Sequence, residues 1–343
     1  MASAGTRPIL IWLWTGCVLI ACMVAIGGIT RLTGSGLSIT EWKPIMGALP
    51  PMNEAEWNEA FEKYKAIPEY TLINQHLDLA GFKGIFFWEY LHRNWGRLMG
   101  LVFIVPFVIF WRKGWLRERW LMRRSLAILV AGGLVGVLGW FMVMSGLEDN
   151  PDVSQYRLAI HLLAAFGVFA LVLWTAFDLS HGRRAWRAAS VAGRTARWIL
   201  LLLVLQIIWG AFTAGLDAGR IYNTWPLMNG SFVPENAGAS GALLSDFTDH
   251  KDGVQFVHRN LAWLVAAAVL WFAWRTRRDP GVAGVVPRAA AGMVVAQFAL
   301  GVITLLAHVP VWLGVLHQLG ALVVLGIWLA LVHRTGISAN PAR

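Results

Sequence analysis

Two stretches of the chain, EYLHRNWGRLMG at residues 89–100 and QFVHRNLAWLVA at residues 255–266, place the triplet His-Arg-Asn at the start of a long apolar run. An ionisable side chain inside an apolar segment is costly unless a partner stabilises it. The same triplet in two distant segments therefore indicates that both segments carry a functional position of the same kind.

The composition is that of an integral membrane protein. Of the 343 residues, 57% are hydrophobic and 14% are charged. A helix of about 20 apolar residues crosses the hydrocarbon core of a bilayer, and its backbone hydrogen bonds are satisfied internally. We therefore predict an all-α membrane protein, embedded in a lipid bilayer, with eight transmembrane helices over residues 9–30, 84–110, 125–146, 158–179, 197–216, 255–274, 288–308 and 312–332.

Most basic residues fall on one side of this topology. Eight spans put both termini on that side, together with 18 basic and three acidic residues. Short basic loops stay in the cytoplasm, so we expect both termini to be cytoplasmic. Because the topology accounts for the net charge of +10, we expect no nucleic-acid partner. The basic residues are Arg7, Arg112, Lys113, Arg117, Arg119, Arg123, Arg124, Arg183, Arg184, Arg187, Arg194, Arg197, Arg275, Arg277, Arg278, Arg288, Arg334 and Arg343.

An internal repeat divides the chain. GGITRLTGSGLSITEWKPIMG at residues 27–47 aligns without a gap with GAFTAGLDAGRIYNTWPLMNG at residues 210–230, and GVLGWF at residues 136–141 matches FALGVI at residues 298–303. We therefore predict two tandem four-helix bundles of the same orientation, residues 1–180 and 181–343. The aligned identities are Gly27, Thr30, Gly36, Trp42 and Gly47 with Gly210, Thr213, Gly219, Trp225 and Gly230.

A long outer segment follows the first and the fifth span. In the first of these segments, NEAEWNEAFEKY at residues 53–64 has the spacing of a short amphipathic helix. Trp57, Phe61 and Tyr64 would form its apolar stripe. Both a lid and a plain packed surface helix fit this pattern, and the packed helix is the preferred interpretation.

Four histidines lie near the outer ends of the even-numbered spans: His92, His161, His258 and His317. A single intramembrane histidine more often forms a hydrogen bond between helices than it ligates a metal. Two neutral imidazoles that face each other can, however, ligate a haem iron from both sides. Matched histidines on duplicated helices favour haem, with His92 paired to His161 and His258 to His317. Zinc is a weaker alternative because no cysteine or third histidine would complete a tetrahedral site.

Three arginines lie close to these histidines. Arg93 and Arg259 follow His92 and His258 directly, and Arg157 lies one turn before His161. A guanidinium group suits a carboxylate, so these residues are candidates for contacts with haem propionates. An equally good alternative is that they extend to lipid headgroups or outer water.

The two predicted pockets differ at one position. Glu89 lies three residues before His92, whereas Gln255 lies three residues before His258. A carboxylate can accept protons during a reaction and an amide cannot. The difference predicts chemistry at the amino-terminal pocket, with Glu89 as its catalytic residue, and electron transfer at the carboxy-terminal one. The alternative is that Glu89 only pairs with Arg93 or Arg157.

The stretch GGITRLTGSGLSITEWKPIMGALPP at residues 27–51, the stretch EYLHRNWGRLMG and the second His-Arg-Asn triplet resemble the haem A synthase family over essentially the whole chain. Members of this family oxidise a ring methyl of haem O to a formyl group, which yields haem A for cytochrome oxidase. The resemblance implies that Glu89 is the functional glutamate and that His92 and His161 take the substrate haem. It also implies that His258 and His317 ligate the iron of a haem b cofactor.

The resemblance carries expectations about partners and location as well. It implies a haem O synthase as the source of the substrate and a bacterial inner membrane with the haem sites near the periplasmic face. A homo-oligomer is compatible with the sequence. Some bacterial members carry cysteine pairs in their outer segments, whereas the two cysteines of this chain, Cys17 and Cys22, both lie in the first span. We therefore expect no disulfide-dependent step.

The rival interpretation is a non-catalytic di-haem b electron carrier of the membrane. Such a protein would explain four histidines and the repeat, but not the difference between Glu89 and Gln255. A transporter would need polar residues through the centre of the bilayer, and the predicted spans have few there.

Overall fold

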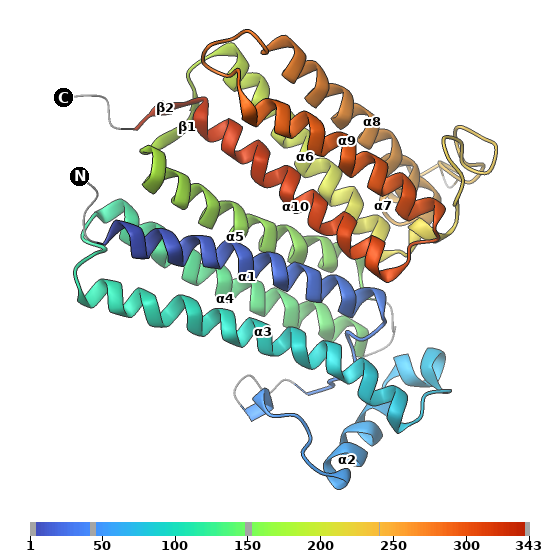
Figure 1. Ribbon diagram of the computed structural model, residues 1–343. Coiled ribbons are helices and arrows are strands. Elements are labelled where there is room, and N and C mark those ends of the chain that lie inside the picture. Colours follow the sequence, from blue (N-terminus) through green and yellow to red (C-terminus); the bar gives the residue numbers. More distant parts are fainter. Residues whose placement is uncertain (1–4, 42–45, 148–152, 240, 340–343) are drawn as a thin grey trace.

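The computed structural model describes residues 5–41, 46–147, 153–239 and 241–339, and it is mostly helical. Within these residues, eight helices are long and apolar enough to cross a membrane (Figure 1). Each predicted span coincides with one of them, so the expected membrane class is confirmed. The helices are α1 (Thr6–Leu32), α3 (Leu79–Arg112), α4 (Arg119–Leu147), α5 (Gln155–His181), α6 (Val191–Gly215), α8 (Lys251–Arg275), α9 (Val285–Leu306) and α10 (Val311–Arg334).

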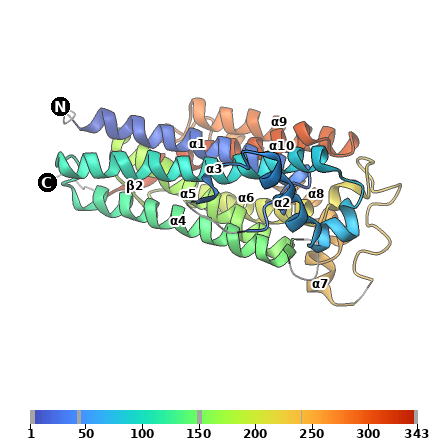
Figure 2. The ribbon, with the colours of Figure 1, turned by 90° about the horizontal axis from the view of Figure 1, so that it is seen from below.

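The long helices lie side by side along a common direction (Figures 1 and 2). In the first half of the chain, α1 packs against α3 and α5, and α4 packs against α5. In the second half, α8 packs against α6 and α9, and α10 packs against α9 and α6. The two halves meet where α1 and α5 contact α10 and where α5 contacts α6.

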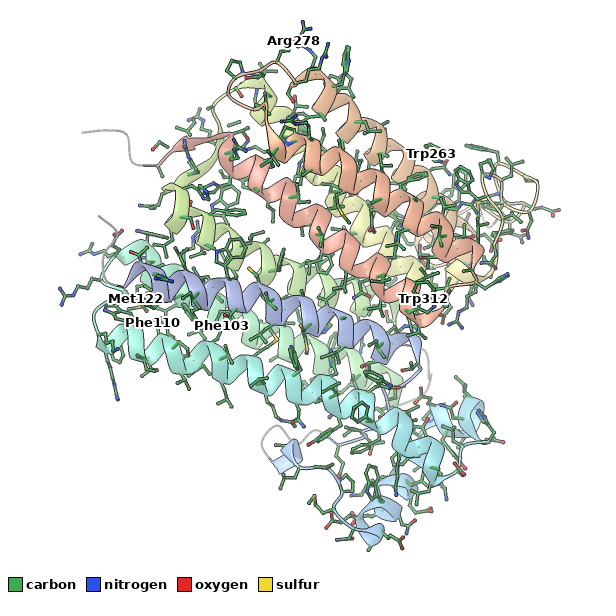
Figure 3. The ribbon with its side chains drawn as sticks, viewed as in Figure 1. Phe103, Phe110, Met122, Trp263, Arg278 and Trp312 are labelled. Atoms are coloured by element: carbon green, nitrogen blue, oxygen red, sulfur yellow. The ribbon has the colours of Figure 1, made fainter. Side chains whose placement is uncertain are left out.

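Aromatic side chains fill the interior of both halves. The Trp12 ring packs against Phe103 and Phe110 of α3, with ring centroids 5.3 Å and 5.6 Å apart (Figure 3). In the second half, Phe272 packs against Trp328 at 5.4 Å. A buried indole N–H needs an acceptor. Trp12 Nε1 donates to the Val102 carbonyl at 3.0 Å, and Trp328 Nε1 donates to the Ala196 carbonyl at 2.8 Å.

The first long helix begins, and the last one ends, at the same end of the molecule (Figure 2). A short antiparallel sheet forms there between β1 (Arg184–Ala188) and β2 (Gly336–Ser338). The sequence predicts no strand, so the all-α expectation is wrong at this point. The reason is physical: a pair of such short strands depends on a partner about 150 residues away and leaves no alternating pattern of its own.

A buried polar contact joins the two halves next to this sheet. His333 Nε2 lies 3.0 Å from Asp178 Oδ1, and both side chains are buried. The same carboxylate oxygen accepts from the Arg184 backbone N–H at 2.9 Å. His333 therefore lies at the interface of α5 and α10.

The outer segments lie at the opposite end. Helix α2 (Glu54–Lys65) confirms the predicted amphipathic helix, and Asn53 caps it by accepting from the Glu56 N–H at 3.0 Å. Its Phe61 and Trp57 pack on the start of α3. The shorter elements are η1 (Met46–Ala48), the π-helix η2 (Tyr70–Asn74), η3 (Ala218–Arg220) and α7 (Leu243–Thr248). Trp42, one member of the predicted repeat, lies outside the described residues.

Glu69 is a buried carboxyl group in the first outer segment. Tyr64 Oη donates to Glu69 Oε2 at 3.2 Å and accepts from Asn74 Nδ2 at 2.8 Å. Glu69 is 7% exposed, and this burial raises its pKa to about 7 from an ordinary value of 4.5. The charged form of the folded protein is therefore destabilised near neutral pH.

We predict that Glu69 makes the protein less stable as pH rises. The folded state binds this proton more tightly than the unfolded state, so stability falls between pH 4.5 and about 7. Glu69→Gln should remove that fall, and its free energy of unfolding at pH 8 should exceed that of the wild type by up to about 3 kcal/mol. Thermal unfolding in detergent at both ends of this range measures the effect. The exposed Glu54→Gln is the control, and equal pH dependence of wild type and Glu69→Gln would contradict the prediction.

Candidate functional site

The structure brings His258 of α8 and His317 of α10 together. Their ring centroids lie 6.4 Å apart, and the ring planes are at 88° to each other. A metal–imidazole bond is about 2 Å long, and the ring centre lies about 1 Å beyond the nitrogen. Two imidazoles on opposite sides of one iron would therefore have centroids about 6 Å apart. The pair has the separation that a shared haem iron requires.

His92 of α3 and His161 of α5 are the second predicted pair. Both residues are partly buried. Nδ1 of His161 is buried, and although the Val135 backbone approaches the ring, this nitrogen makes no hydrogen bond of ordinary geometry with the described residues. An uncompensated buried nitrogen is costly, which is typical of a position built for a ligand. We refer below to His92 and His161 as the N-terminal pair and to His258 and His317 as the C-terminal pair.

A glycine of the adjacent odd-numbered span lies against each of the four rings. A Cβ atom there would meet the imidazole at 2.8–3.1 Å, which is closer than ordinary van der Waals contact. Each ring therefore occupies the space that a side chain on the neighbouring helix would take. The contacts join Gly27 of α1 to His92, Gly139 of α4 to His161, Gly210 of α6 to His258 and Gly301 of α9 to His317.

Glu89 lies one turn from His92 and is only 3% exposed. Its Oε1 accepts from Nε and Nη2 of Arg93, at 3.0 Å and 2.6 Å. Its Oε2 accepts from the Ser38 hydroxyl and from the Ile39 N–H, both at 2.7 Å. A carboxylate has about four acceptor positions, so these donors fill all of them. The arrangement holds the Glu89 side chain in one position.

Gln255 takes the equivalent place beside His258 and is also buried. Its Nε2 donates to the Tyr222 carbonyl at 3.2 Å, and its Oε1 has no partner among the described residues. The first outer segment therefore presents hydrogen-bond donors to Glu89, whereas the second presents an acceptor to Gln255. The two sites differ in hydrogen bonding as well as in charge.

The three predicted arginines have different surroundings. Arg93 binds Glu89 and also the Ile39 and Glu41 carbonyls. Arg157 donates to the Phe141 carbonyl at 2.9 Å and stacks on the Phe141 ring. Arg259 donates through Nη2 to three carbonyls of the second outer segment, while its buried Nη1 has no partner in the described part of the chain. Of the three arginines, Arg259 is therefore the one whose free N–H donor best suits a carboxylate ligand.

Comparison with known proteins gives a consistent result. The family model described as "Cytochrome oxidase assembly protein" matches residues 10–329. The heme A synthase of Rhodospirillum centenum is 46% identical over 97% of this chain and 89% of its own length. Those of Parvibaculum lavamentivorans and Beijerinckia indica are 46% and 45% identical, over 97% and 98% of this chain and 95% of each relative. The chain belongs to the cytochrome oxidase assembly protein family.

Several residues that surround the histidines of this family member could not be predicted from its sequence. These are Ser38, the four glycines, and Gln206 and Gln297, whose amides approach the C-terminal pair. The glycines left a signal, because Gly27 and Gly210, and Gly139 and Gly301, occupy matched places in the repeated stretches. The glutamines left none, because they have no counterpart in the first half.

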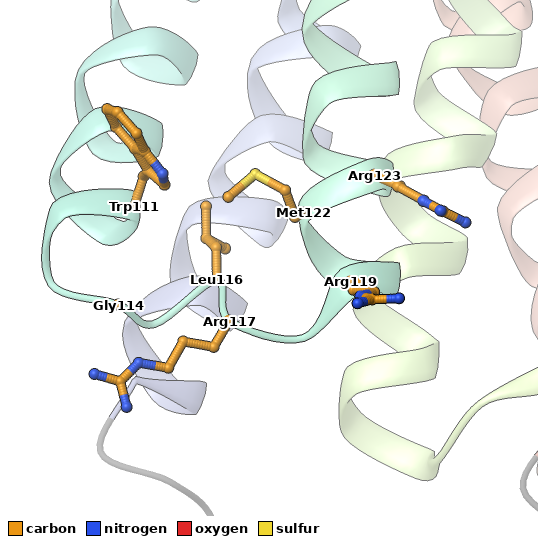
Figure 4. Close-up of a pocket in the computed structure, with 7 residues that line it drawn as sticks. All are labelled: Trp111, Gly114, Leu116, Arg117, Arg119, Met122 and Arg123. Carbon is orange, nitrogen blue, oxygen red and sulfur yellow. The ribbon is translucent and has the colours of Figure 1, made fainter.

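A surface hollow lies between the ends of α3 and α4, at the other end of the helices (Figure 4). Trp111, Leu116 and Met122 line it together with Arg117, Arg119 and Arg123. Aromatic and basic side chains at the end of transmembrane helices are typical of the headgroup region. The hollow is separate from the candidate site.

We predict that Gly301→Ala displaces the His317 ring and weakens haem binding by the C-terminal pair. The added Cβ would lie 2.8 Å from His317 Cε1, so the ring must move. Loss of support for a ligand typically costs about 10–100-fold in affinity for the metal group. The haem absorbance per mole of purified protein measures this loss. Gly292→Ala is the matched control because it lies on the same helix with open space around it, and equal haem content in both variants would refute the prediction.

Proposed function

We propose that this protein is a haem A synthase, a multi-pass membrane oxidoreductase that converts a ring methyl of haem O into the formyl group of haem A for cytochrome oxidase. The relatives with that name cover nearly the whole chain and support the assignment. The observation that carries the proposal is the buried Glu89 beside the N-terminal pair, at a place where the C-terminal pair has Gln255. The same relatives give no support to a non-catalytic di-haem carrier.

The two halves, residues 1–180 and 181–343, are proposed to be tandem four-helix bundles of one duplicated unit. Two backbone features support this relation. The helices α1 and α6 both end at matched positions, and the residues that follow, Gly34 and Asp217, both adopt left-handed backbone conformations with φ of 62° and 50°. Gly34 lies seven residues after Gly27, and Asp217 lies seven residues after Gly210.

We assign the C-terminal pair to a resident haem b and the N-terminal pair to the substrate haem. His258 and His317 would ligate the haem b iron, and the free Nη1 of Arg259 would bind a propionate. Arg93 is already engaged by Glu89, which leaves Arg157 as the remaining propionate candidate at the N-terminal pair. A bound haem supplies one-electron chemistry that side chains lack.

Glu89 is proposed to accept protons from the reacting methyl carbon as it is oxidised. Because its acceptor positions are full, one donor must turn away when a proton arrives. The Ser38 hydroxyl is the donor that can do so, since it lies 3.1 Å from the Ser35 carbonyl and can donate there instead. The Arg93 guanidinium and the Ile39 N–H hold the carboxylate in position meanwhile.

The location follows from the charge distribution. The basic loops lie at the end of the helices opposite the outer segments, and short basic loops favour the cytoplasm. We therefore propose that the termini are cytoplasmic and that the haem sites lie near the periplasmic face of a bacterial inner membrane. Haem O would come from a haem O synthase, which we propose as the upstream partner. A homo-oligomer is compatible with this arrangement.

We predict that Glu89→Gln binds haem O but converts it slowly. The amide matches the carboxylate in shape, and its oxygen can still accept from Arg93, while its nitrogen can donate to the Ser38 hydroxyl. Loss of a positioned proton acceptor typically costs about 10²–10⁴-fold in rate. Co-expression with a haem O synthase followed by pigment extraction should show haem O or its alcohol in place of haem A. Glu69→Gln, a buried carboxyl of the outer segment, is the control and should still yield haem A. Near-normal haem A from well-folded Glu89→Gln would leave Glu89 as a structural partner of Arg93.

A further inference from the structure

A glutamine of the adjacent odd-numbered span approaches each histidine of the C-terminal pair. Gln206 Nε2 of α6 lies 3.1 Å from His258 Nδ1 and donates to the His258 carbonyl at 3.2 Å. Gln297 Nε2 of α9 lies 3.2 Å from His317 Nδ1 and donates to the His317 carbonyl at 2.8 Å. Two separate helices therefore provide the same contact, one for each ring.

Within the described residues, no amide takes this place beside the N-terminal pair. Gln206 and Gln297 each lie four residues before the glycine that touches the ring, which is one helical turn. The residues four positions before Gly27 and Gly139 are Met23 and Val135. Neither side chain can hydrogen-bond strongly to an imidazole, and what approaches the His161 ring is the Val135 backbone rather than an amide side chain. The two pairs thus differ in how their rings are supported.

The chemistry of ligation explains what an amide does at this place. A ring nitrogen that binds iron carries no proton, so the other nitrogen carries one and needs an acceptor. The side-chain oxygens of Gln206 and Gln297 are buried and make no hydrogen bond within the described residues. Half a turn of each amide exchanges its nitrogen and oxygen and brings that oxygen to Nδ1–H, at the cost of the hydrogen bond to the carbonyl of the same histidine. Each glutamine can therefore serve the free ring as a donor and the ligating ring as an acceptor.

We propose that Gln206 and Gln297 are positioning residues that fix the orientation and the proton of the C-terminal imidazoles, so that this pair retains its haem and holds it at a lower reduction potential. Met23 and Val135 give the N-terminal rings no side-chain hydrogen bond, which suits a haem that must enter as substrate and leave as product. The inference rests on the proposed assignment of haem b to the C-terminal pair. An acceptor at Nδ1–H makes the ring a more basic ligand, which favours the oxidised iron.

The test replaces each glutamine of the second half with the residue at the matched position of the first half. In a His92→Ala background, which removes a ligand of the N-terminal pair, the haem spectrum reports on the C-terminal pair alone. Gln206→Met and Gln297→Val should each raise the midpoint potential of the bound haem. They should also increase its loss to excess apomyoglobin by about 10–100-fold. Gln318→Leu is the matched control, because Gln318 lies on α10 beside His317 but donates to the Val24 carbonyl. It should change neither quantity.

A second variant separates hydrogen bonding from packing. Gln297→Glu keeps the shape of the side chain and offers a stronger acceptor, so it should lower the potential where Gln297→Val raises it. A packing defect would move both variants in the same direction. In the other half, with His92 intact, Val135→Gln should slow the loss of haem from the N-terminal pair.

The outcomes distinguish this inference from the function on which it rests. If His258→Ala and His317→Ala leave the haem spectrum of the background unchanged, the assignment of haem b fails. If those two variants lose the haem but the glutamine variants match Gln318→Leu in potential and haem loss, the assignment stands and the role of the glutamines is overturned. Shifts of equal sign in Gln297→Val and Gln297→Glu would also overturn it.

Discussion

The contact between an imidazole ring and a glycine of the adjacent helix is the constraint on which the rest of the structure depends. It occurs once in each of the helix pairs α1–α3, α4–α5, α6–α8 and α9–α10. Small residues let transmembrane helices approach closely. Here they also make room for a large polar ring that must stay away from lipid, because an ionisable group in the hydrocarbon region is costly. The same contact thereby sets the spacing of each helix pair, with the Cε1 and Nδ1 edge of the ring against the glycine at His161, His258 and His317 and the Nε2 edge at His92.

The outer segments adapt to the residue that lies one turn before the first histidine of each pair. An arginine binds backbone carbonyls of the outer segment in both halves, Arg93 in the first and Arg259 in the second. The carboxylate of Glu89 then requires donors and receives the Ile39 N–H and the Ser38 hydroxyl, whereas the Gln255 amide donates to a carbonyl. A single difference in side-chain chemistry is therefore accompanied by a different backbone arrangement around it.

The two histidine pairs also differ in what supports their rings, and this difference matches the proposed division of work. A resident cofactor benefits from rings that are fixed by hydrogen bonds, as Gln206 and Gln297 allow. A substrate must exchange, so weaker support is an advantage at the N-terminal pair. The proton acceptor, in turn, lies only beside the pair proposed to hold the substrate. On the proposed assignment, retention and reactivity would be separated between two similar halves of one chain.

The sequence by itself determined the membrane class, the eight spans, the amphipathic helix of the outer segment and the membership of the family. These properties depend on composition and local periodicity, which are read directly along the chain. Only the tertiary structure decided that Arg93 binds Glu89, that Ser38 completes its donors, that glutamines reach His258 and His317, and that a short sheet joins β1 to β2. Ser38 and Glu89 are 51 residues apart, and Gln206 and His258 are 52 apart. Contacts at such separations have no local signature, because the side chains meet only when the helices have packed.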